Sequence, residues 1–375
     1  MNLFATAFSV MLLLVVAELL VLQFWQKRAV PWNEIVANLN SGHILMWVFR
    51  GVEVALFAWV LAHANLHWVD QMPVALQWGF AFVAWDFSFY WMHRMHHKVP
   101  LFWAVHVVHH QGEHFSLSLG IRNSWYSSLT SFVFTAPLAV LGVPLDIFVI
   151  VSTIHYAIQF YNHTGLVNSS GILDRLIVTP SNHRVHHGND PLYRNRNFGG
   201  TLLVWDKLFG TYQAEVPGVP MEHGLHGGVP SQNPFWLNHD GWLRALRRRF
   251  PQLQDLARLA VPEWLVASAG GILFGVVIFY VDHEADFAGG LQTALFALLF
   301  LSTLALGGMS DGKRWGSVAW VTLAVAAPAL FLGVYGLRQV WAEVFFTAMA
   351  LHGLEVGRRV AAQMMVNQSQ EKAWK

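Results

Sequence analysis

Long apolar runs alternate with short polar segments along most of the chain. A membrane-spanning α-helix needs about 20 predominantly apolar residues, and residues 3–25, 44–66 and 73–91 provide three such runs. The first run is too long for a cleaved signal peptide and lacks its basic start and small-residue cleavage site. Four more runs lie in the last third of the chain, at residues 264–281, 289–306, 316–335 and 340–354. This pattern predicts an all-α protein that crosses a membrane repeatedly.

Two shorter apolar runs, residues 128–141 and 145–161, flank the turn signal Gly142-Val143-Pro144. They predict a helical hairpin, which either crosses the membrane as two short spans or is re-entrant. With the hairpin counted as two, we expect about nine transmembrane or re-entrant helices. A polar stretch from residue 162 to about residue 262 follows the hairpin.

These patterns divide the chain into four parts. We expect N-terminal transmembrane helices at residues 1–85, a histidine-rich domain that includes the hairpin at 86–215, a connecting segment at 216–262, and C-terminal transmembrane helices at 263–375. Many glycine and alanine residues in the last part favour close helix packing. Those helices could form a lipid tunnel, a dimer contact or a plain scaffold, and the sequence does not indicate an oligomeric state.

The composition narrows the class of protein. Hydrophobic residues make up 55% of the 375 residues and charged residues 12%, against roughly 25% charged in a soluble domain. These values exclude a disordered chain, a coiled coil and an ordinary soluble globule. The net charge of +1 gives no sign of nucleic-acid binding. The absence of cysteine excludes disulfides, iron–sulfur clusters, thiolate metal ligands and cysteine nucleophiles.

The distribution of charge predicts an orientation in the membrane. Cytoplasmic loops carry an excess of Lys and Arg, and the basic groups that fall on one predicted side are Lys27, Arg28, Arg94, Lys98, Arg247, Arg248, Arg249, Lys313, Arg314, Arg358 and Arg359. The opposite loops hold Asp70, Asp282, Glu284 and Asp286, with Arg338 as the exception. We expect the histidine-rich region and the C-terminus to face the cytoplasm, in the inner membrane if the protein is bacterial. Arg50 and Glu53 interrupt the second run and are expected to pair with each other, or to lie near its polar end.

Histidine is unusually abundant, with 20 residues against 23 Lys plus Arg. Positions i, i+3 and i+4 share one face of a helix, and three clusters have that spacing. His93 and His97 form an i, i+4 pair, and His-x-x-His-His begins at His106 and again at His183. His163 ends the predicted hairpin on the same side of the membrane.

This spacing points to a metal centre. Neutral imidazole suits zinc, copper, iron and nickel. The candidate ligands are His93, His97, His106, His109, His110, His163, His183, His186 and His187. This set exceeds the four ligands of a tetrahedral zinc, so we expect two metal ions with about five nitrogen ligands each. His96 points away from His97 on a helix and is left out, His114 and His155 are ambiguous, and the remaining histidines are interpreted as structural.

Several polar residues could support these ligands. Asp86, Tyr90 and His93 share one helical face, so Asp86 could fix the tautomer of a ligating imidazole. The alternative is a buried carboxylate that binds another element. Gln159 lies one helical turn before His163 and could reach the metal directly or through water.

The number of histidines separates this pattern from common metal enzymes. Ferritin-like di-iron sites use Glu-x-x-His pairs, and zinc hydrolases keep three protein ligands with a carboxylate base; neither pattern is evident. A haem would need only one or two histidines. Two redox-active metals beside a bilayer suit reductive oxygen activation, with the lipid chain held among apolar helices and its reacting carbon at the metals.

Residues 86–213 carry longer motifs that resemble a known family. These are Asp86-x3-Tyr90-x2-His93-Arg94, Leu101-Phe102-Trp103-Ala104-x-His106, Gln159-Phe160-Tyr161-x-His163-Thr164, Thr179-Pro180-Ser181-Asn182-His183-Arg184-Val185-His186-His187-Gly188 and Gly199-Gly200-Thr201-Leu202-x2-Trp205-Asp206-Lys207-x-Phe209-Gly210-Thr211. Together they resemble the fatty acid hydroxylase/sterol desaturase superfamily of histidine-box membrane di-iron oxygenases. Within it, the chain is most similar to bacterial sterol-desaturase-like proteins and alkylglycerol monooxygenases.

The resemblance implies a non-haem di-iron oxygenase that uses O2 and external electrons to hydroxylate or desaturate a lipid. It implies that the nine histidines ligate two iron ions, and one division gives His93, His106, His109 and His183 to the same iron. Arg122 and Asn197 stand where relatives have polar residues, either for orienting substrate or ligands or as ordinary loop residues. No motif for an electron carrier lies in the chain, so a separate electron-transfer partner is expected.

Three departures weaken the specific assignment to an alkylglycerol ether-lipid monooxygenase with a tetrahydropterin. Lys98 and Gly165 replace acidic residues of relatives, and His114 replaces an aromatic residue. That assignment stays an alternative. Two others are a membrane metal-binding or transport protein without oxygenase turnover, and a degenerate family member that binds lipid only. A transporter would need polar groups along a path through the spans, whereas these histidines cluster at one face.

Overall fold

The structure is a computed structural model and describes residues 1–41, 43–229, 231–247, 259 and 261–373. Arg248 and Arg249 therefore lie outside the described residues. In these ranges the regular structure is helical, apart from one isolated antiparallel bridge between Ile177 and Leu202. The prediction of an all-α protein is confirmed.

The first half of the chain is helical and contains the predicted hairpin. Its helices are α1 (Leu3–Leu20, continued by the π-helical turn Val21–Trp25), α2 (Trp32–Asn40), α3 (His43–Ala64), α4 (Val74–Lys98), α5 (Pro100–His110), α6 (Leu117–Ile121), α7 (Ser127–Leu141) and α8 (Leu145–Asn162). The hairpin of α7 and α8 is present, and Gly142 ends α7 in the left-handed conformation at φ 91°, where glycine has no steric penalty.

The second half contains a polar region and a helical bundle. The short helices of the polar region are the 3-10 turn Gly171–Arg175, α9 (Pro180–His187), α10 (Val204–Leu208) and α11 (Pro234–Ala245). The bundle contains α12 (Glu263–His283), the 3-10 turn Glu284–Asp286, α13 (Gly289–Ser310), α14 (Arg314–Pro328) with the π-helical turn Ala329–Val334, and α15 (Val340–Ala373).

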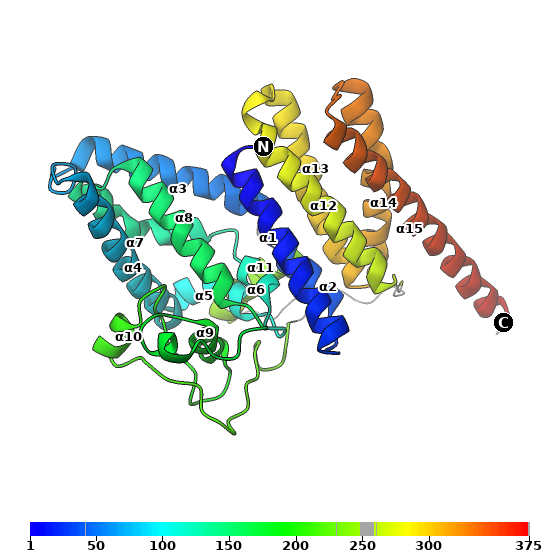
Figure 1. Cartoon of the computed structure of the whole chain (residues 1–375). Helices are drawn as coiled ribbons and strands as arrows, with labels where there is room; N and C mark the ends of the chain where they lie inside the picture. The colour runs from blue at the N-terminus through cyan, green and yellow to red at the C-terminus, as the bar shows by residue number, and fades with distance from the viewer. Residues whose placement is uncertain (42, 230, 248–258, 260, 374–375) are drawn as a thin grey trace.

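The helices are arranged in two groups joined by the N-terminal helices. Helices α3, α4, α7 and α8 lie at one side, α12 to α15 lie at the other, and α1 and α2 lie between them (Figure 1). Both α1 and α2 contact α12 on one side and α6 on the other. Helices α9 and α10, with their connecting loops, lie at the end of the molecule opposite the N-terminus (Figure 1).

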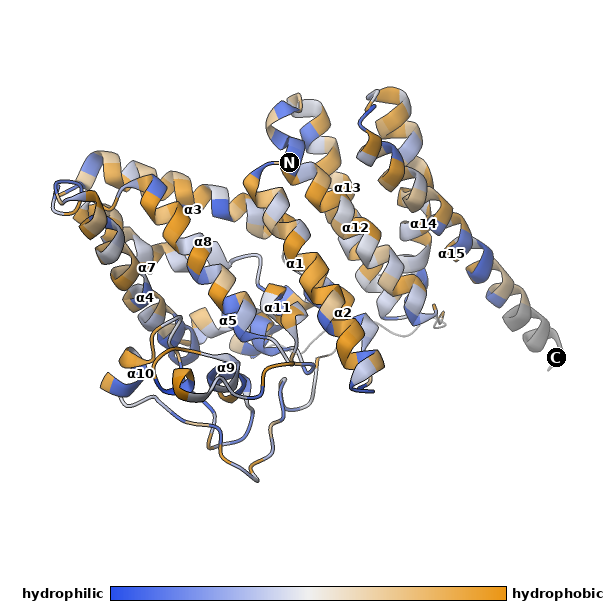
Figure 2. Ribbon diagram, in the orientation of Figure 1, coloured by the Kyte–Doolittle hydropathy of each residue, from blue (hydrophilic) through white to orange (hydrophobic). Residues whose placement is uncertain are grey.

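Among the residues that the structure describes, five helical segments are long and apolar enough to cross a membrane: Leu3–Trp25, Trp32–Ala64, Glu263–Asp286, Gly289–Ser310 and Arg314–Val334. Hydrophobic residues are frequent along these helices, and hydrophilic residues are frequent in the loops around α9 (Figure 2). The chain is a multipass membrane protein. The expected total of nine segments, the orientation and the four-part division of the chain stay predictions.

Buried polar contacts link the helices inside this apolar framework. Arg50 and Glu53 pair at 2.7 Å, as expected, and Ser131 donates a hydrogen bond to Glu53 over 2.8 Å. Close helix packing in the bundle is also present, because a Cβ at Gly316 would lie 2.3 Å from the backbone of Gly308. His352 has a structural role there: it accepts a hydrogen bond from Trp320.

Candidate metal centre

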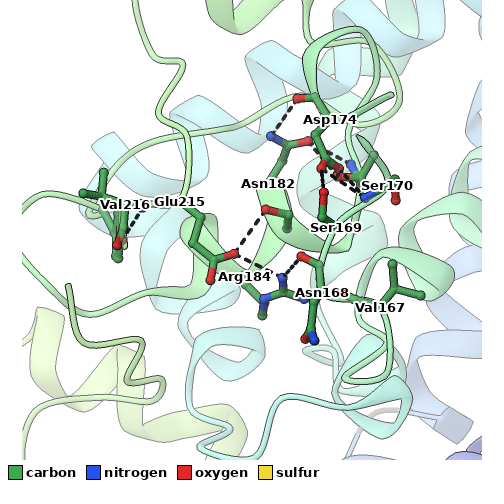
Figure 3. Close-up of polar contacts among 12 residues, drawn as sticks. Val167, Asn168, Ser169, Ser170, Asp174, Asn182, Arg184, Glu215 and Val216 are labelled. Atoms are coloured by element: carbon green, nitrogen blue, oxygen red, sulfur yellow. Dashed lines mark hydrogen bonds and ion pairs between the residues drawn. The ribbon is translucent and has the colours of Figure 1, made fainter. Parts of the chain in front are cut away.

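The histidine clusters lie on helices whose ends are fixed by local sequence. Proline occupies the first turn of α5 and of α9, where its missing N–H costs no helical hydrogen bond. Thr179 and Asn182 form a capping box at the start of α9. Arg184 then donates to the carbonyl oxygens of Val167 and Asn168, each over 2.6 Å, and pairs with Glu215 (Figure 3). These contacts fix α9 against the loop that follows α8.

All nine predicted histidines come together, in two separate groups. We call the first group site A, formed by His93, His97, His106, His110 and His186. The second group, site B, is formed by His109, His163, His183 and His187. Within each group the candidate nitrogen atoms all lie within 4.8 Å of one another. Neither His96, which bonds Met92 and Thr130, nor His155, which bonds Thr201, belongs to a group.

The division between the two groups follows helix geometry. Residues i and i+4 differ by only about 40° around a helix, whereas i+3 and i+4 differ by about 100°. Helix α5 accordingly sends His106 and His110 to site A and His109 to site B. Helix α9 does the reverse, with His186 in site A. The expected division, which placed His93, His106, His109 and His183 on one iron, is therefore wrong.

Backbone carbonyl oxygens orient four of the ligands through Nδ1. His93 bonds Phe198 at 3.0 Å and His186 bonds Arg196 at 2.9 Å in site A. The corresponding bonds in site B join His109 to Arg122 at 2.8 Å and His163 to Gln159 at 2.7 Å. A carbonyl oxygen only accepts, so each Nδ1 carries the proton and each Nε2 presents a lone pair to its group.

These lone pairs fit a bound cation. The Nε2 atoms of His109 and His163 lie 3.1 Å apart, and those of His163 and His183 lie 3.0 Å apart. The Nε2 atoms of His109 and His163 are both unprotonated, and at this distance they repel each other unless a cation lies between them. Nε2 of His97 is buried with no hydrogen-bond partner. The donor set is entirely nitrogen, which suits a borderline transition metal such as iron.

Burial keeps the imidazoles in the ligand form. It lowers the pKa of His109 to about 4 and that of His186 to about 3, from an ordinary value of 6.5. Desolvation disfavours the imidazolium ion, and neighbouring histidines add to the effect at other ligands such as His183. Near neutral pH both groups therefore present neutral nitrogen donors.

The predicted role of Asp86 in fixing the tautomer of a ligating imidazole needs correction. The carboxylate of Asp86 accepts hydrogen bonds from the backbone N–H of Thr201 at 2.7 Å and from Nε1 of Trp205 at 2.8 Å. It holds the loop before α10 and does not bond His93. Tyr90 bonds Thr211 at 3.0 Å. The alternative interpretation of Asp86, a buried carboxylate that binds another element, is the one that the structure shows.

The other three supporting candidates lie close to the ligands. The side-chain amide of Gln159 donates to the carbonyl of Gly200, while its backbone oxygen bonds His163. Arg122 is fully buried, donates to Val108 at 2.7 Å and to Asn38 at 2.9 Å, and orients His109 through its carbonyl. Asn197, at φ 52°, bonds the backbone of Gln213. It thereby fixes the segment that carries the Arg196 and Phe198 carbonyls.

Two buried carboxylates, Asp206 and Glu18, were not predicted from the sequence as part of the site. Asp206 is fully buried and accepts hydrogen bonds from the backbone N–H of Phe198 at 2.8 Å and of Gly199 at 2.7 Å. It therefore supports site A, and it lies in a motif that had been quoted without a role. Glu18 interrupts an apolar run, which is the signal that could have singled it out.

Comparison with known proteins gives the same picture. A sequence model of the fatty acid hydroxylase family matches residues 78–211. Alkylglycerol monooxygenase of Xenopus tropicalis is 32% identical over 237 residues, covering 61% of this chain and 50% of the relative. The human alkylglycerol monooxygenase is 34% identical over 220 residues, covering 56% and 47%. Ornithine lipid hydroxylase OlsE of Rhizobium tropici is 28% identical over 214 residues, covering 55% and 64%.

The chain spans about half the length of the alkylglycerol monooxygenases that it matches. No solved structure matches it. The residues that the family model matches include all nine histidines of sites A and B. In the structure these histidines form the two groups described above. Over residues 78–211, the chain is thus similar to the fatty acid hydroxylase family.

Proposed function

We propose that this protein is a membrane-bound non-haem di-iron oxygenase that hydroxylates or desaturates a C–H bond of a lipid. The observation that carries the proposal is the pair of adjacent imidazole groups, sites A and B, formed by histidines of α4, α5 and α9 and by His163 at the end of α8. Relatives named as alkylglycerol monooxygenases and an ornithine lipid hydroxylase support an oxidoreductase that acts on lipids. Iron bound in the two groups would supply activated oxygen strong enough to remove hydrogen from an unactivated C–H bond.

The residues of this chain have simple roles in such a reaction. Five imidazoles would hold one ion and four the other, with Nδ1–carbonyl bonds fixing their tautomers. Hydroxylation consumes O2, two electrons and two protons and releases water besides the product. A separate partner would supply the electrons. We propose that it approaches from the cytoplasm, the side that the basic residues predict.

A cleft beside site A offers a route for the lipid chain. It has a volume of about 210 Å³ and lies between α5 and α11, lined by Pro100, Trp103, Val107, Gly241, Arg244 and Ala245. The ring of Trp103 lies 5.1 Å from that of His97 and 5.6 Å from that of His110. His97 and His106 are also the two ligands that are not fully buried. We propose that the reacting part of the lipid approaches site A here.

The substrate is proposed at the level of a lipid. The relatives include proteins named for an ether lipid and for an ornithine lipid, and these do not favour the alkylglycerol alternative. Gly165 is one of the departures from that group, and its place is tight, because a Cβ there would lie 2.8 Å from the carbonyl oxygen of Phe115. A larger residue would therefore displace the loop beside His163.

Lipid profiling of cells tests the function. Cells that express the protein should contain a lipid that is heavier by one oxygen atom or lighter by two hydrogen atoms than in cells without it. A His183→Ala variant should abolish the change. Oxygen uptake coupled to lipid in the purified, iron-loaded protein should accompany it. Iron-loaded protein that changes no lipid and consumes no O2 would refute the proposal in favour of metal or lipid binding alone.

A further inference from the structure

Three polar side chains of the N-terminal helices reach the segment that follows α5. Glu34 of α2 accepts hydrogen bonds from the backbone N–H of Glu113 at 2.8 Å and of His114 at 2.9 Å. Asn38 of α2 donates to Ser118 over 3.0 Å and accepts from Arg122. Glu18 of α1 accepts from the backbone N–H of Leu117 at 2.5 Å. Residues 111–122, which begin directly after the ligand His110, are therefore fixed by helices outside the family match.

Glu18 makes the most extensive of these contacts. Glu18 is 2% exposed and lies in the last turn of the apolar helix α1. One oxygen accepts from Leu117, while the other accepts from the hydroxyl of Thr164 at 2.7 Å and from the backbone N–H of Gly165 at 2.8 Å. The carboxylate thus joins the start of α6 to the turn directly after His163. A buried carboxylate is tolerated only when donors replace its water, and here three do so.

Both of the segments that Glu18 joins carry parts of site B. Helix α6 lies against the His163 ring, since a Cβ at Gly120 would come within 3.0 Å of its Nδ1. Arg122, which follows α6, bonds Nδ1 of His109 through its carbonyl oxygen. His163 itself directly precedes Thr164. One carboxylate from α1 therefore joins the two segments that position His109 and His163.

Site A is supported from elsewhere. The carbonyl oxygens of Phe198 and Arg196 orient His93 and His186, and Asp206 holds that segment in place. Within the described residues, the hydrogen bonds of Glu18 involve neither a ligand of site A nor the segment 196–198. Loss of the Glu18 contacts should consequently affect one group and spare the other.

We propose that Glu18 is a positioning residue for the metal ion of site B, which makes the N-terminal helix part of the metal centre. This inference rests on the proposed function in one respect, that sites A and B each bind a metal ion. Removing a group that orients metal ligands typically lowers metal affinity about 10- to 100-fold, so the effect is expected on site B alone.

Glu18→Gln tests the proposal in the full-length, detergent-purified protein. An amide presents one oxygen and one NH2 group. In one orientation the NH2 group faces the N–H of Leu117, and in the other it faces the hydroxyl of Thr164 and the N–H of Gly165. A donor therefore meets a donor in either case. Iron or the spectroscopic probe Co2+ is titrated and counted per chain. Wild type should bind two ions, and Glu18→Gln should bind one tightly and the second about 10- to 100-fold more weakly. Thr164→Val removes one of the three donors and should give an intermediate loss.

Glu53→Gln provides a matched control. Glu53 is also a buried carboxylate within an apolar helix, 1% exposed, but it bonds Arg50 and Ser131, which are remote in sequence from the ligands. It should lower thermal stability yet leave two tight ions. Two tight ions in Glu18→Gln, or equal weakening of both ions, would overturn the proposal. Wild type that binds two ions without oxidising lipid would instead refute the proposed function and leave this result intact.

Discussion

At the scale of single residues, the chemistry of the ligands is set by what their other ring nitrogen contacts. The sequence spacing was sufficient to single out eight of the nine histidines, because i, i+3 and i+4 relationships are local, and His163 was singled out by its place at the end of the predicted hairpin. The spacing could not predict the carbonyl partners. Phe198 and Arg122 orient His93 and His109 from 105 and 13 positions away, and a backbone oxygen leaves no trace in residue type. Asp86 was given the wrong role because its partners lie 115 and 119 positions away.

The buried ligands predict a dependence of stability on pH. Burial holds the pKa of His109 at about 4 and that of His186 at about 3, whereas an unfolded chain has the ordinary value of 6.5. Between these values the unfolded state binds more protons, so the free energy of unfolding falls as the pH is lowered from 6.5 towards 4. Protons also compete with metal for Nε2.

This prediction is checked by thermal unfolding and metal content of the purified protein at pH 7.5, 6.0 and 5.0. Both should decline below about pH 6.5, and the decline in stability should be present in metal-free protein as well. Unchanged unfolding temperature and metal content at pH 5.0 would contradict it.

At the scale of elements, different segments of the chain hold site A and site B in place. Site A depends on the segment before α10, where the carboxylate of Asp206 accepts from Phe198, Gly199 and the Thr211 hydroxyl. Asp206→Asn places an NH2 group against at least one of these donors. We expect it to weaken the ion of site A about 10- to 100-fold and to spare site B, the opposite of Glu18→Gln.

Metal titration of the two variants and of their combination checks this assignment. Because the two substitutions act on different groups, their effects should add, and the double variant should hold neither ion tightly. Loss of both ions in Asp206→Asn alone would show that the two groups do not bind independently.

The cleft between α5 and α11 is the element-scale feature that bears on the substrate. Ala245→Trp should fill it from the α11 side without touching a ligand. We expect kcat/KM for the lipid to fall at least about 10-fold, since a substrate that is displaced by about 1 Å from its reactive position loses about 100-fold in rate. Iron content should stay at the wild-type value. Leu246→Trp, at the neighbouring exposed position, is the control and should leave kcat/KM unchanged.

At the scale of the whole molecule, the lengths of the apolar runs are enough to predict the fold class and the hairpin. They do not predict which helices contact one another. The division at residue 85 suggested an N-terminal region separate from the histidine-rich one. In the structure α1 and α2 lie between the group α3, α4, α7 and α8 and the C-terminal bundle. Glu18, Glu34 and Asn38 bond residues beyond position 110. Such contacts depend on which helices become neighbours, which run length and composition leave open.

The orientation of the molecule is the remaining prediction at this scale, and the cysteine-free sequence makes it directly testable. Ala214 and Ala285 are exposed and lie at opposite ends, beyond α10 and between α12 and α13. The excess of Lys and Arg predicts that the Ala214 end faces the cytoplasm. A membrane-impermeant maleimide should therefore label Ala285→Cys in intact cells and Ala214→Cys only after the membrane is opened. Labelling of Ala214→Cys in intact cells would place the metal centre on the outer side, where a cytoplasmic electron donor could not reach it.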